Sequence, residues 1–166
     1  MSKLEKHWPQ IMKLANRAFP KYAFATINAD GSPHVTPMGS LILKDNCTGF
    51  YFEGFSEQMR ENLNRDNRIS VLISDFRLVS WIIPLLSGRF SNPNAVRLNG
   101  TVGKRREATQ SEMDAFKKDK WAVNLARILR WRGYRILWEP LSYVRDIKFH
   151  AFESVNLGKM SHGHWE

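Results

Sequence analysis

The sequence predicts a mainly β protein: a small antiparallel β-barrel of six to seven strands with helices at its periphery. Three observations favour this fold. Short strand-like runs recur at close spacing, turn signals such as Asp30-Gly31 separate them, and helices are inserted between only some of the strands. No linker, repeat or low-complexity tract divides the chain, so we expect a single domain over residues 1–166.

The first segments predict a helix and a hairpin. Residues 9–18 have Pro9 at a position that the first turn of a helix tolerates, with apolar residues at helical spacing behind it. We therefore expect an amphipathic helix within residues 1–20. Residues 22–27 then alternate as a strand does and lead into Asp30-Gly31, which is a hairpin signal because the turn requires a positive φ.

The next run, residues 34–43, is irregular. It contains Pro37 and Gly39, which a fully paired central strand resists. We expect a bulge, an exposed segment, or a strand whose backbone faces something other than a neighbouring strand. A second turn leads into the aromatic strand at 49–55, so three strands in sequence are expected to form an antiparallel meander.

At residue 56 the pattern changes from strand to helix. Ser56 is a good N-cap, and the residues after it suit a helix of about three turns. Residues 68–74 are typical of a buried strand. The run at 79–86, VSWIIPLL, is interrupted by Pro84 and favours a short helix or a loop. We expect this run in the core or at a dimer contact, because exposing it would create a costly apolar patch.

The second half of the chain adds further strands and helices. The pattern predicts a strand from residue 95 with a bend at Gly100 or Gly103, a helix capped by Thr109 or Ser111, a helix with a narrow basic stripe at 121–131, strands at 134–138 and 143–152, and a C-terminal tail at 154–166.

Charge and cysteine content narrow the class of protein. The formal net charge is +9, and seven basic residues lie between 117 and 135 against one acid, Asp119. Such a surplus suits nucleic acid, an acidic membrane face or phosphorylated small ligands, and the sum does not choose among them. The single cysteine, Cys47, excludes an intramolecular disulfide. With neither a secretion signal nor a membrane-spanning stretch, the sequence predicts a cytoplasmic protein with no membrane partner.

The segment from 21 to 75 resembles a known family. FATINADGSPHVTPM, a turn, and then GFYFEGFSEQMRENLNRDNRISVLISD are similar in order to the pyridoxamine 5'-phosphate oxidase-like, FMN-binding split-barrel family. AVRLNGTVGKRREATQSE resembles the next strand and helix of that family. The resemblance implies a split barrel and a homodimer with FMN in a groove at its interface. Motifs of pyridoxamine 5'-phosphate oxidase proper are missing, so that specific activity is not expected.

The resemblance also implies where the flavin binds. The ring is expected against the irregular strand, with Phe55 or an aromatic residue of the partner over its face, and the phosphate at the Ser56 helix, where free amides, a hydroxyl and Arg60 are available. Met59 stands where family members often have Lys or Arg, which leaves the phosphate site one cation short. The expected cofactor-binding residues are Val35, Thr36, Pro37, Met38, Phe55, Ser56, Met59, Arg60, Asn62 and Arg97.

These features predict a flavoprotein that binds FMN without a covalent bond and acts as an oxidoreductase on a small-molecule substrate. No catalytic acid or nucleophile is assigned, because the flavin supplies the chemistry. A deazaflavin is an alternative to FMN. A second hypothesis, prompted by Met59, is a non-catalytic binding module on the same fold that carries haem, flavin or another anionic ligand. The sequence indicates neither the substrate nor the electron donor.

Several of these residues also have ordinary structural explanations. Ser56 caps a helix whether or not it binds phosphate. Arg60 and Asn62 suit a solvated helix surface, and Arg97 suits a salt bridge. Glu53, at the end of an aromatic strand, is expected to pair with an arginine.

The histidines and the basic segment also have ordinary structural explanations. His34 fits a surface residue beside a turn better than a proton-transfer group. His150, His162 and His164 suggest a metal or haem site, but MSHGHWE is more typical of a terminal tail, so no metal is expected. The basic run at 117–135 accompanies no nucleic-acid motif, so nucleic acid is not an expected partner.

Overall fold

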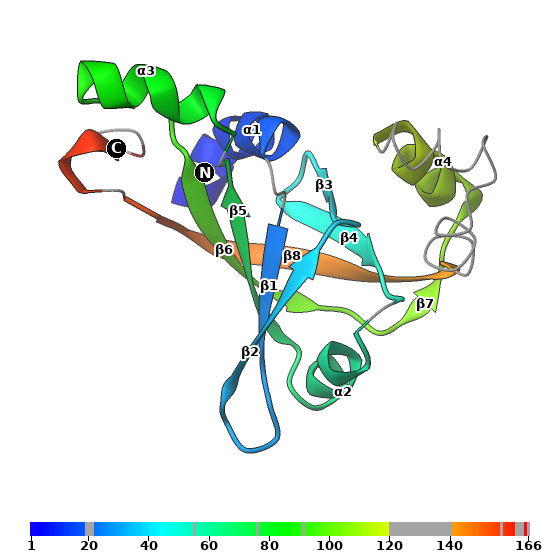
Figure 1. Ribbon diagram of the computed structural model, residues 1–166. Helices are drawn as coiled ribbons and strands as arrows, with labels where there is room; N and C mark the ends of the chain where they lie inside the picture. The colour runs from blue at the N-terminus through cyan, green and yellow to red at the C-terminus, as the bar shows by residue number, and fades with distance from the viewer. Residues whose placement is uncertain are drawn as a thin grey trace.

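The computed structural model describes residues 1–18, 22–54, 56–75, 77–90, 92–119, 141–156, 158–161 and 165, and the statements below concern those residues. Seven strands form one curled antiparallel sheet in the order β2-β1-β5-β6-β8-β4-β3, and an eighth, β7, pairs with β8 (Figure 1). The predicted mainly β, antiparallel split-barrel fold is therefore confirmed.

The strands are β1 Tyr22–Ile27, β2 Pro33–Met38, β3 Ile42–Lys44, β4 Thr48–Phe52, β5 Arg68–Ser74, β6 Ala95–Val102, β7 Arg106–Glu107 and β8 Tyr143–Ser154. The helices are α1 Lys3–Arg17, α2 Glu57–Arg65, α3 Val79–Ser87 and α4 Gln110–Asp119, followed by a 3₁₀ turn, η1, at Gly158–Ser161. The predicted helix at 121–131 and strand at 134–138 lie outside the described residues.

The hairpin between β1 and β2 forms as predicted. The two strands pair along their whole length, from Tyr22 opposite Met38 to Ile27 opposite Pro33. Gly31 adopts a φ of 84°, which a residue with a side chain tolerates poorly. The Ser32 amide donates to the Asp30 carboxylate at 2.9 Å and closes the turn.

The predicted three-stranded meander is wrong in one respect. β2 pairs with β1 and β3 pairs with β4, but β2 and β3 lie at opposite ends of the sheet. The chain leaves β2 through Gly39, Ser40 and Leu41, where the Ser40 hydroxyl donates to the Phe52 carbonyl at 3.0 Å. This crossing opens the barrel between its two edge strands, and Pro37 fits the edge because proline has no amide to donate.

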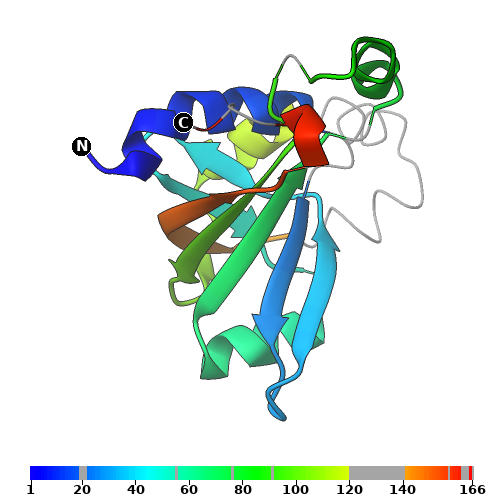
Figure 2. The same ribbon diagram turned by 90° about the vertical axis from the view of Figure 1, so that its left-hand side faces the viewer.

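The main core lies between the inner face of the sheet and α1, and α2 lies across the opposite end of the strands (Figure 2). α1 begins earlier than predicted, because Ser2 and Glu5 form a capping box. Pro9 is consequently inside the helix and not in its first turn. A smaller aromatic cluster, including Phe52 and Phe116, packs between β4 and α4.

The bend predicted at Gly100 is present as a register shift between β6 and β8 after Asn99. A Cβ atom at Gly100 would lie 2.5 Å from the Lys148 carbonyl oxygen, so a residue without a side chain is required for the two backbones to approach. Thr109 caps α4, since the Glu112 amide donates to its hydroxyl at 3.3 Å.

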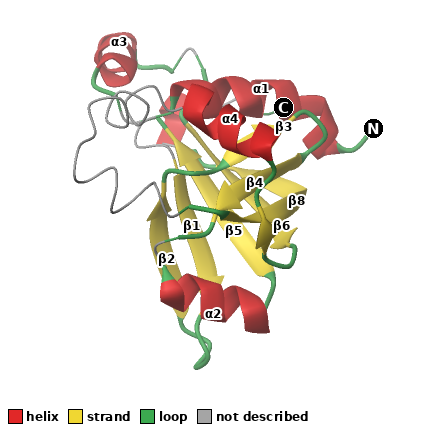
Figure 3. Cartoon of the chain, turned by 90° about the vertical axis from the view of Figure 1, so that its right-hand side faces the viewer, coloured by secondary structure: helices red, strands yellow, loops and turns green. Residues whose placement is uncertain are grey.

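α3 departs from the sequence prediction. It is a helix, but it stands away from the sheet, and Ile82 and Ile83 are 47% and 61% exposed (Figure 3). The sequence predicts this run in the core or at a dimer contact. It does not lie in the core of the described chain, because only one side of the helix meets the rest of that chain, and a dimer contact stays a prediction. Among the described residues, no helix combines the length and apolarity that crossing a bilayer requires.

Candidate functional site

The start of α2 has the features of an anion-binding helix terminus. Ser56 is the N-cap, and its hydroxyl accepts a hydrogen bond from the Met59 amide at 3.2 Å. The amides of Glu57 and Gln58 find no acceptor among the described residues. Arg60 is half-buried and lies 2.9 Å from the Glu57 carboxylate. Free amides and an available guanidinium are what a phosphate group requires.

Asn62 and Met59 have structural roles on the same helix. The Asn62 amide donates to Thr26 at 3.1 Å and to Asn28 at 2.9 Å, and its oxygen accepts from Gln58 and Arg65. Its hydrogen-bonding capacity is thus used to fasten α2 to β1. Met59 is 1% exposed and belongs to the main core. At this position an apolar side chain adds packing to the core and no charge to the helix start.

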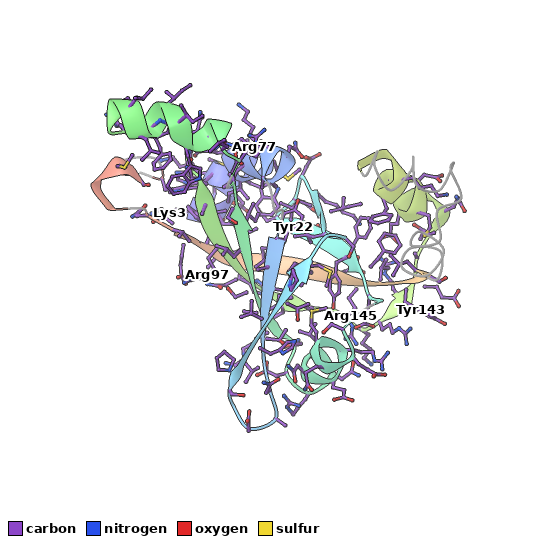
Figure 4. The ribbon with its side chains drawn as sticks, viewed as in Figure 1. Lys3, Tyr22, Arg77, Arg97, Tyr143 and Arg145 are labelled. Atoms are coloured by element: carbon purple, nitrogen blue, oxygen red, sulfur yellow. The ribbon has the colours of Figure 1, made fainter. Side chains whose placement is uncertain are left out.

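A buried charge cluster lies between the end of β4 and α2. The Arg145 guanidinium donates to the Glu53 carboxylate at 2.7 Å and to the Asn64 side chain at 2.6 Å. Arg105 lies 3.3 Å from the second Glu53 oxygen and stacks over the Tyr143 ring at 3.7 Å. Figure 4 shows Arg145 beside α2. The prediction that Glu53 pairs with an arginine is confirmed.

Tyr51 faces the same interior as this cluster. It pairs with Arg145 across β4 and β8, and its side chain is fully buried. Its hydroxyl has no hydrogen-bond partner among the described residues. Burial raises the pKa of Tyr51, the Glu53 carboxylate adds to that rise, and Arg145 opposes it. The phenol therefore stays neutral and keeps a proton that it can donate.

β2 presents two different faces at the open edge of the barrel. Val35 and Pro37 lie opposite Ala25 and Ala23 on the outer face of the sheet, and Val35 is 63% exposed. Thr36 and Met38 lie opposite Phe24 and Tyr22 on the inner face, which α2 also meets. Because β2 has one neighbouring strand, its other edge keeps unpaired backbone groups.

Arg97 lies apart from the rest of the predicted set. It is on β6, three steps from β2 in the sheet order, which corresponds to about 14 Å across the sheet. Its guanidinium donates to Glu153 at 2.8 Å, so it takes part in the salt bridge that the sequence left as its alternative explanation. It shares the outer face with Pro37 but does not approach α2.

The described residues line several cavities, and the predicted set lines none of the following three. One, about 570 Å³, lies on the sheet and includes Ala25, Ile27, Ser70 and Asn99. A second, about 240 Å³, lies at the base of α3, and a third of about 370 Å³ lies where β4, β6 and β8 meet.

Several predicted residues lie outside the described residues or away from the start of α2. Phe55, His162 and His164 lie outside the described residues, as does most of the basic 117–135 segment. His150 is exposed on β8 and lies 2.9 Å from the Thr101 hydroxyl. Sequence reasoning missed Arg105 and Arg145. The one available signal for Arg145 was a charged residue within the final strand.

The chain is similar to proteins of one family. The sequence pattern of the pyridoxamine 5'-phosphate oxidase family matches residues 15–135. No protein with a curated description matches the chain. Many solved structures are similar to the chain, and the following three share its fold over most of their length.

The first is an FMN-binding protein from Syntrophomonas wolfei, with a TM-score of 0.56 and 13% identity over 93% of this chain and 95% of that one. The second is HupZ from Group A Streptococcus, with a TM-score of 0.55 and 18% identity over 89% and 94%. The third is a conserved hypothetical protein from Mycobacterium tuberculosis, with a TM-score of 0.56 and 19% identity over 94% and 85%. At these sequence identities, the similarity establishes a shared fold and nothing further. Since the family pattern covers most of the chain, the protein belongs to the pyridoxamine 5'-phosphate oxidase-like family of split barrels.

Proposed function

We propose that the protein is a homodimeric flavoprotein that holds FMN without a covalent bond and uses it to oxidise or reduce a small-molecule substrate. The observation that carries the proposal is the start of α2, where two free amides and Arg60 belong to a helix that packs against β1, the only neighbour of the edge strand β2 in the described sheet. FMN joins a phosphate to a ring with polar edges, so one molecule can use both features.

The residues present fit the phosphate despite Met59. Arg60 contributes one cation at the helix start. Its ion pair with Glu57 is weak, because the Glu57 side chain is exposed to water, so a phosphate can compete for the guanidinium. Arg105 is 40% exposed and lies 3.3 Å from the carboxylate of Glu53, three residues before the cap, so it adds a second guanidinium near the helix start. These groups replace the charge that Met59 does not supply.

The ring is assigned to the edge of β2 at Val35, Thr36, Pro37 and Met38. When bound, the flavin supplies the hydride or electron transfer, and the protein positions it and excludes water. Tyr51 lies inside the barrel, where its ring contacts Phe24 of β1, the neighbour of β2, and the Glu53–Arg145 pair lies close to Tyr51 at the end of β4 and on β8. They keep fixed charges and a neutral hydrogen-bond donor near the proposed site. Arg97 is not assigned to the phosphate, because Glu153 holds it on another strand.

The second subunit is assigned to the outer face of the sheet. That face carries small or apolar side chains at half-buried positions, including Ala23, Ala25 and Ile27, and continues into the exposed Val35. The groove of about 570 Å³ beside it is lined mainly by apolar surface. A patch of this kind at a sheet edge is suited to a partner subunit, which would complete the flavin groove.

The visible absorption spectrum of the protein as isolated is the direct test. A flavin spectrum, together with an FMN titration followed by quenching of flavin fluorescence, is expected. The second candidate, a binding module for haem or another anionic ligand, rests on the apolar Met59 at the expected cation position. A Soret band, or a colourless protein with no affinity for FMN, would favour that candidate instead.

A further inference from the structure

α3 exposes an apolar surface that nothing in the described chain covers. Of the large apolar side chains that are exposed in the described residues, five belong to α3 and the residue before it: Leu78, Ile82, Ile83, Leu85 and Leu86. Their exposed fractions run from 47% to 85%. At the angular spacing of a helix, they occupy one half of its circumference. The other half contains the buried Pro84 and Trp81, which packs against Phe90.

A polar cavity of about 240 Å³ opens at the base of this helix. Ile83 and Pro84 of α3 form part of its wall, and Arg17, Arg77, Ser80 and Asn94 supply polar groups. Both arginines are partly exposed. The cavity is therefore continuous with the helix surface and accessible from solvent.

The one carboxylate that lines this cavity, Asp75, already accepts hydrogen bonds from neighbouring side chains. Asp75 accepts hydrogen bonds from the Arg77 guanidinium at 2.9 and 2.8 Å and from the Ser80 hydroxyl at 2.9 Å. Arg17 adds a charge contact at 3.6 Å. Two guanidinium groups against one saturated carboxylate leave the cavity with a net positive charge.

Two donors in the same cavity have no acceptor. The Asn94 side chain is 9% exposed, and its amide nitrogen has no hydrogen-bond partner among the described residues. The Arg17 Nε is also buried and donates no hydrogen bond among the described residues, although another nitrogen of that side chain donates to the Pro93 carbonyl. Buried donors without acceptors are costly, so this cavity is suited to a ligand that brings acceptor oxygens.

The size of α3 argues against a second protein copy as its sole partner. A nine-residue helix is about 14 Å long and about 10 Å wide, whereas a stable protein interface covers about 800 Å² on each side. A lipid surface has no such minimum. The net charge of +9 and the exposed Arg89 just after the helix favour an anionic surface.

We propose that α3 and the cavity at its base bind an anionic phospholipid surface, with the apolar face of α3 entering the interface and a phosphate oxygen accepting from Asn94 and Arg17. Short apolar helices beside basic residues bind membranes in this way without spanning them. This goes beyond the proposed flavin function and replaces the sequence-based expectation that a membrane is not a partner.

Co-sedimentation with lipid vesicles tests the proposal on the full chain. The wild-type protein is expected to bind vesicles of phosphatidylcholine mixed with phosphatidylglycerol, and to bind pure phosphatidylcholine less well. Ile82→Ser with Leu86→Ser should weaken binding by about tenfold or more, because the variant transfers less apolar surface from water into the membrane. Ile82→Met with Leu86→Met, which keeps the apolar surface, should bind as the wild type does.

The headgroup contact has its own matched pair of variants. Asn94→Asp keeps the side-chain shape and places a carboxylate where the phosphate would sit, so the preference for phosphatidylglycerol should fall by about threefold or more. Asn67→Asp makes the same change at the opposite end of β5, where Asn67 is exposed. It should leave the preference unchanged, and an equal loss in both variants would mean a general charge effect and overturn the site.

Two further outcomes would also reject the lipid assignment. If inorganic phosphate raises the melting temperature of the wild type through Asn94 while vesicle binding is insensitive to Asn94→Asp, the cavity binds a soluble phosphate. If the Ser double variant changes the sedimentation coefficient without any change in vesicle binding, α3 is a protein interface.

Discussion

Glu53 and Arg145 form an ion pair of 2.7 Å in which each side chain is only 4% exposed. Glu53 directly follows β4, Arg145 is on β8, and the guanidinium also holds Asn64 of α2. The pair therefore ties two strands to the helix whose start is the proposed phosphate site. The Asn64 side chain accepts a further hydrogen bond from the Arg145 guanidinium, and Arg105 makes a charge contact of 3.3 Å with the second Glu53 oxygen, which has no hydrogen bond among the described residues.

Arg145→Gln should destabilise the protein by about 2–4 kcal/mol, because Glu53 would remain buried with only the partly exposed Arg105 as a charge partner. Urea denaturation measures the change. Arg97→Gln is the control, since its pair with Glu153 is about half exposed and should cost less than about 1 kcal/mol. Equal costs for both variants would show that burial of the first pair contributes nothing.

The stability of the fold should depend on pH through Glu112. The Arg106 guanidinium donates to this carboxylate at 2.9 and 2.7 Å and lowers its pKa from the ordinary value of 4.5 to about 2. A lowered pKa means that the stabilisation is present above the unfolded value and is lost as the pH falls from about 4.5 toward 2.

Glu112→Gln should remove that part of the acid dependence, at a cost of about 1–2 kcal/mol at neutral pH. Free energies of unfolding measured from neutral pH down to acid conditions check this. Curves for wild type and variant that stay parallel through the acid range would mean that Glu112 is not the responsible group.

FMN binding should depend on the phosphate contact at Ser56. Ser56→Asp keeps a helix-capping acceptor but places a negative charge against the phosphate, so FMN affinity should fall by about tenfold or more. Riboflavin, which lacks the phosphate, should bind wild type and variant equally. Fluorescence titration of both ligands gives the comparison, and a parallel loss for riboflavin would place the effect elsewhere.

Gly100→Ala should destabilise the protein by about 1–3 kcal/mol, because the new Cβ would lie 2.5 Å from the Lys148 carbonyl oxygen on the adjacent strand. Gly103→Ala makes the same change where the nearest atom is 3.6 Å away, and it should be nearly neutral. Thermal unfolding of both variants tests the contact. A neutral Gly100→Ala would mean that β6 and β8 can separate without cost.

Val35→Glu should convert the proposed dimer into a monomer, because it places a charge on the outer face of the sheet. Analytical ultracentrifugation at micromolar concentration measures the state. Leu86→Glu on α3 is the control, since the dimer is assigned to the sheet and not to that helix. A wild-type monomer would remove the shared flavin groove altogether.

The sequence by itself determined the local elements and the family. Asp30-Gly31 specified a hairpin, Ser56 capped α2 as predicted, and the register shift after Asn99 lies at a predicted bend. Each of these depends on the backbone preference of a few adjacent residues, which a linear pattern reveals. The same reasoning placed Glu53 beside an arginine but could not say which one.

Only the tertiary structure decided which elements are neighbours. Sheet order separated β2 from β3, distributed the predicted ring contacts over both faces of the sheet, and left Arg97 with Glu153. It also brought Arg145 to Glu53 across 92 residues and left the apolar side of α3 uncovered. Such contacts follow from long-range pairing and chain closure, which no local run of residues encodes.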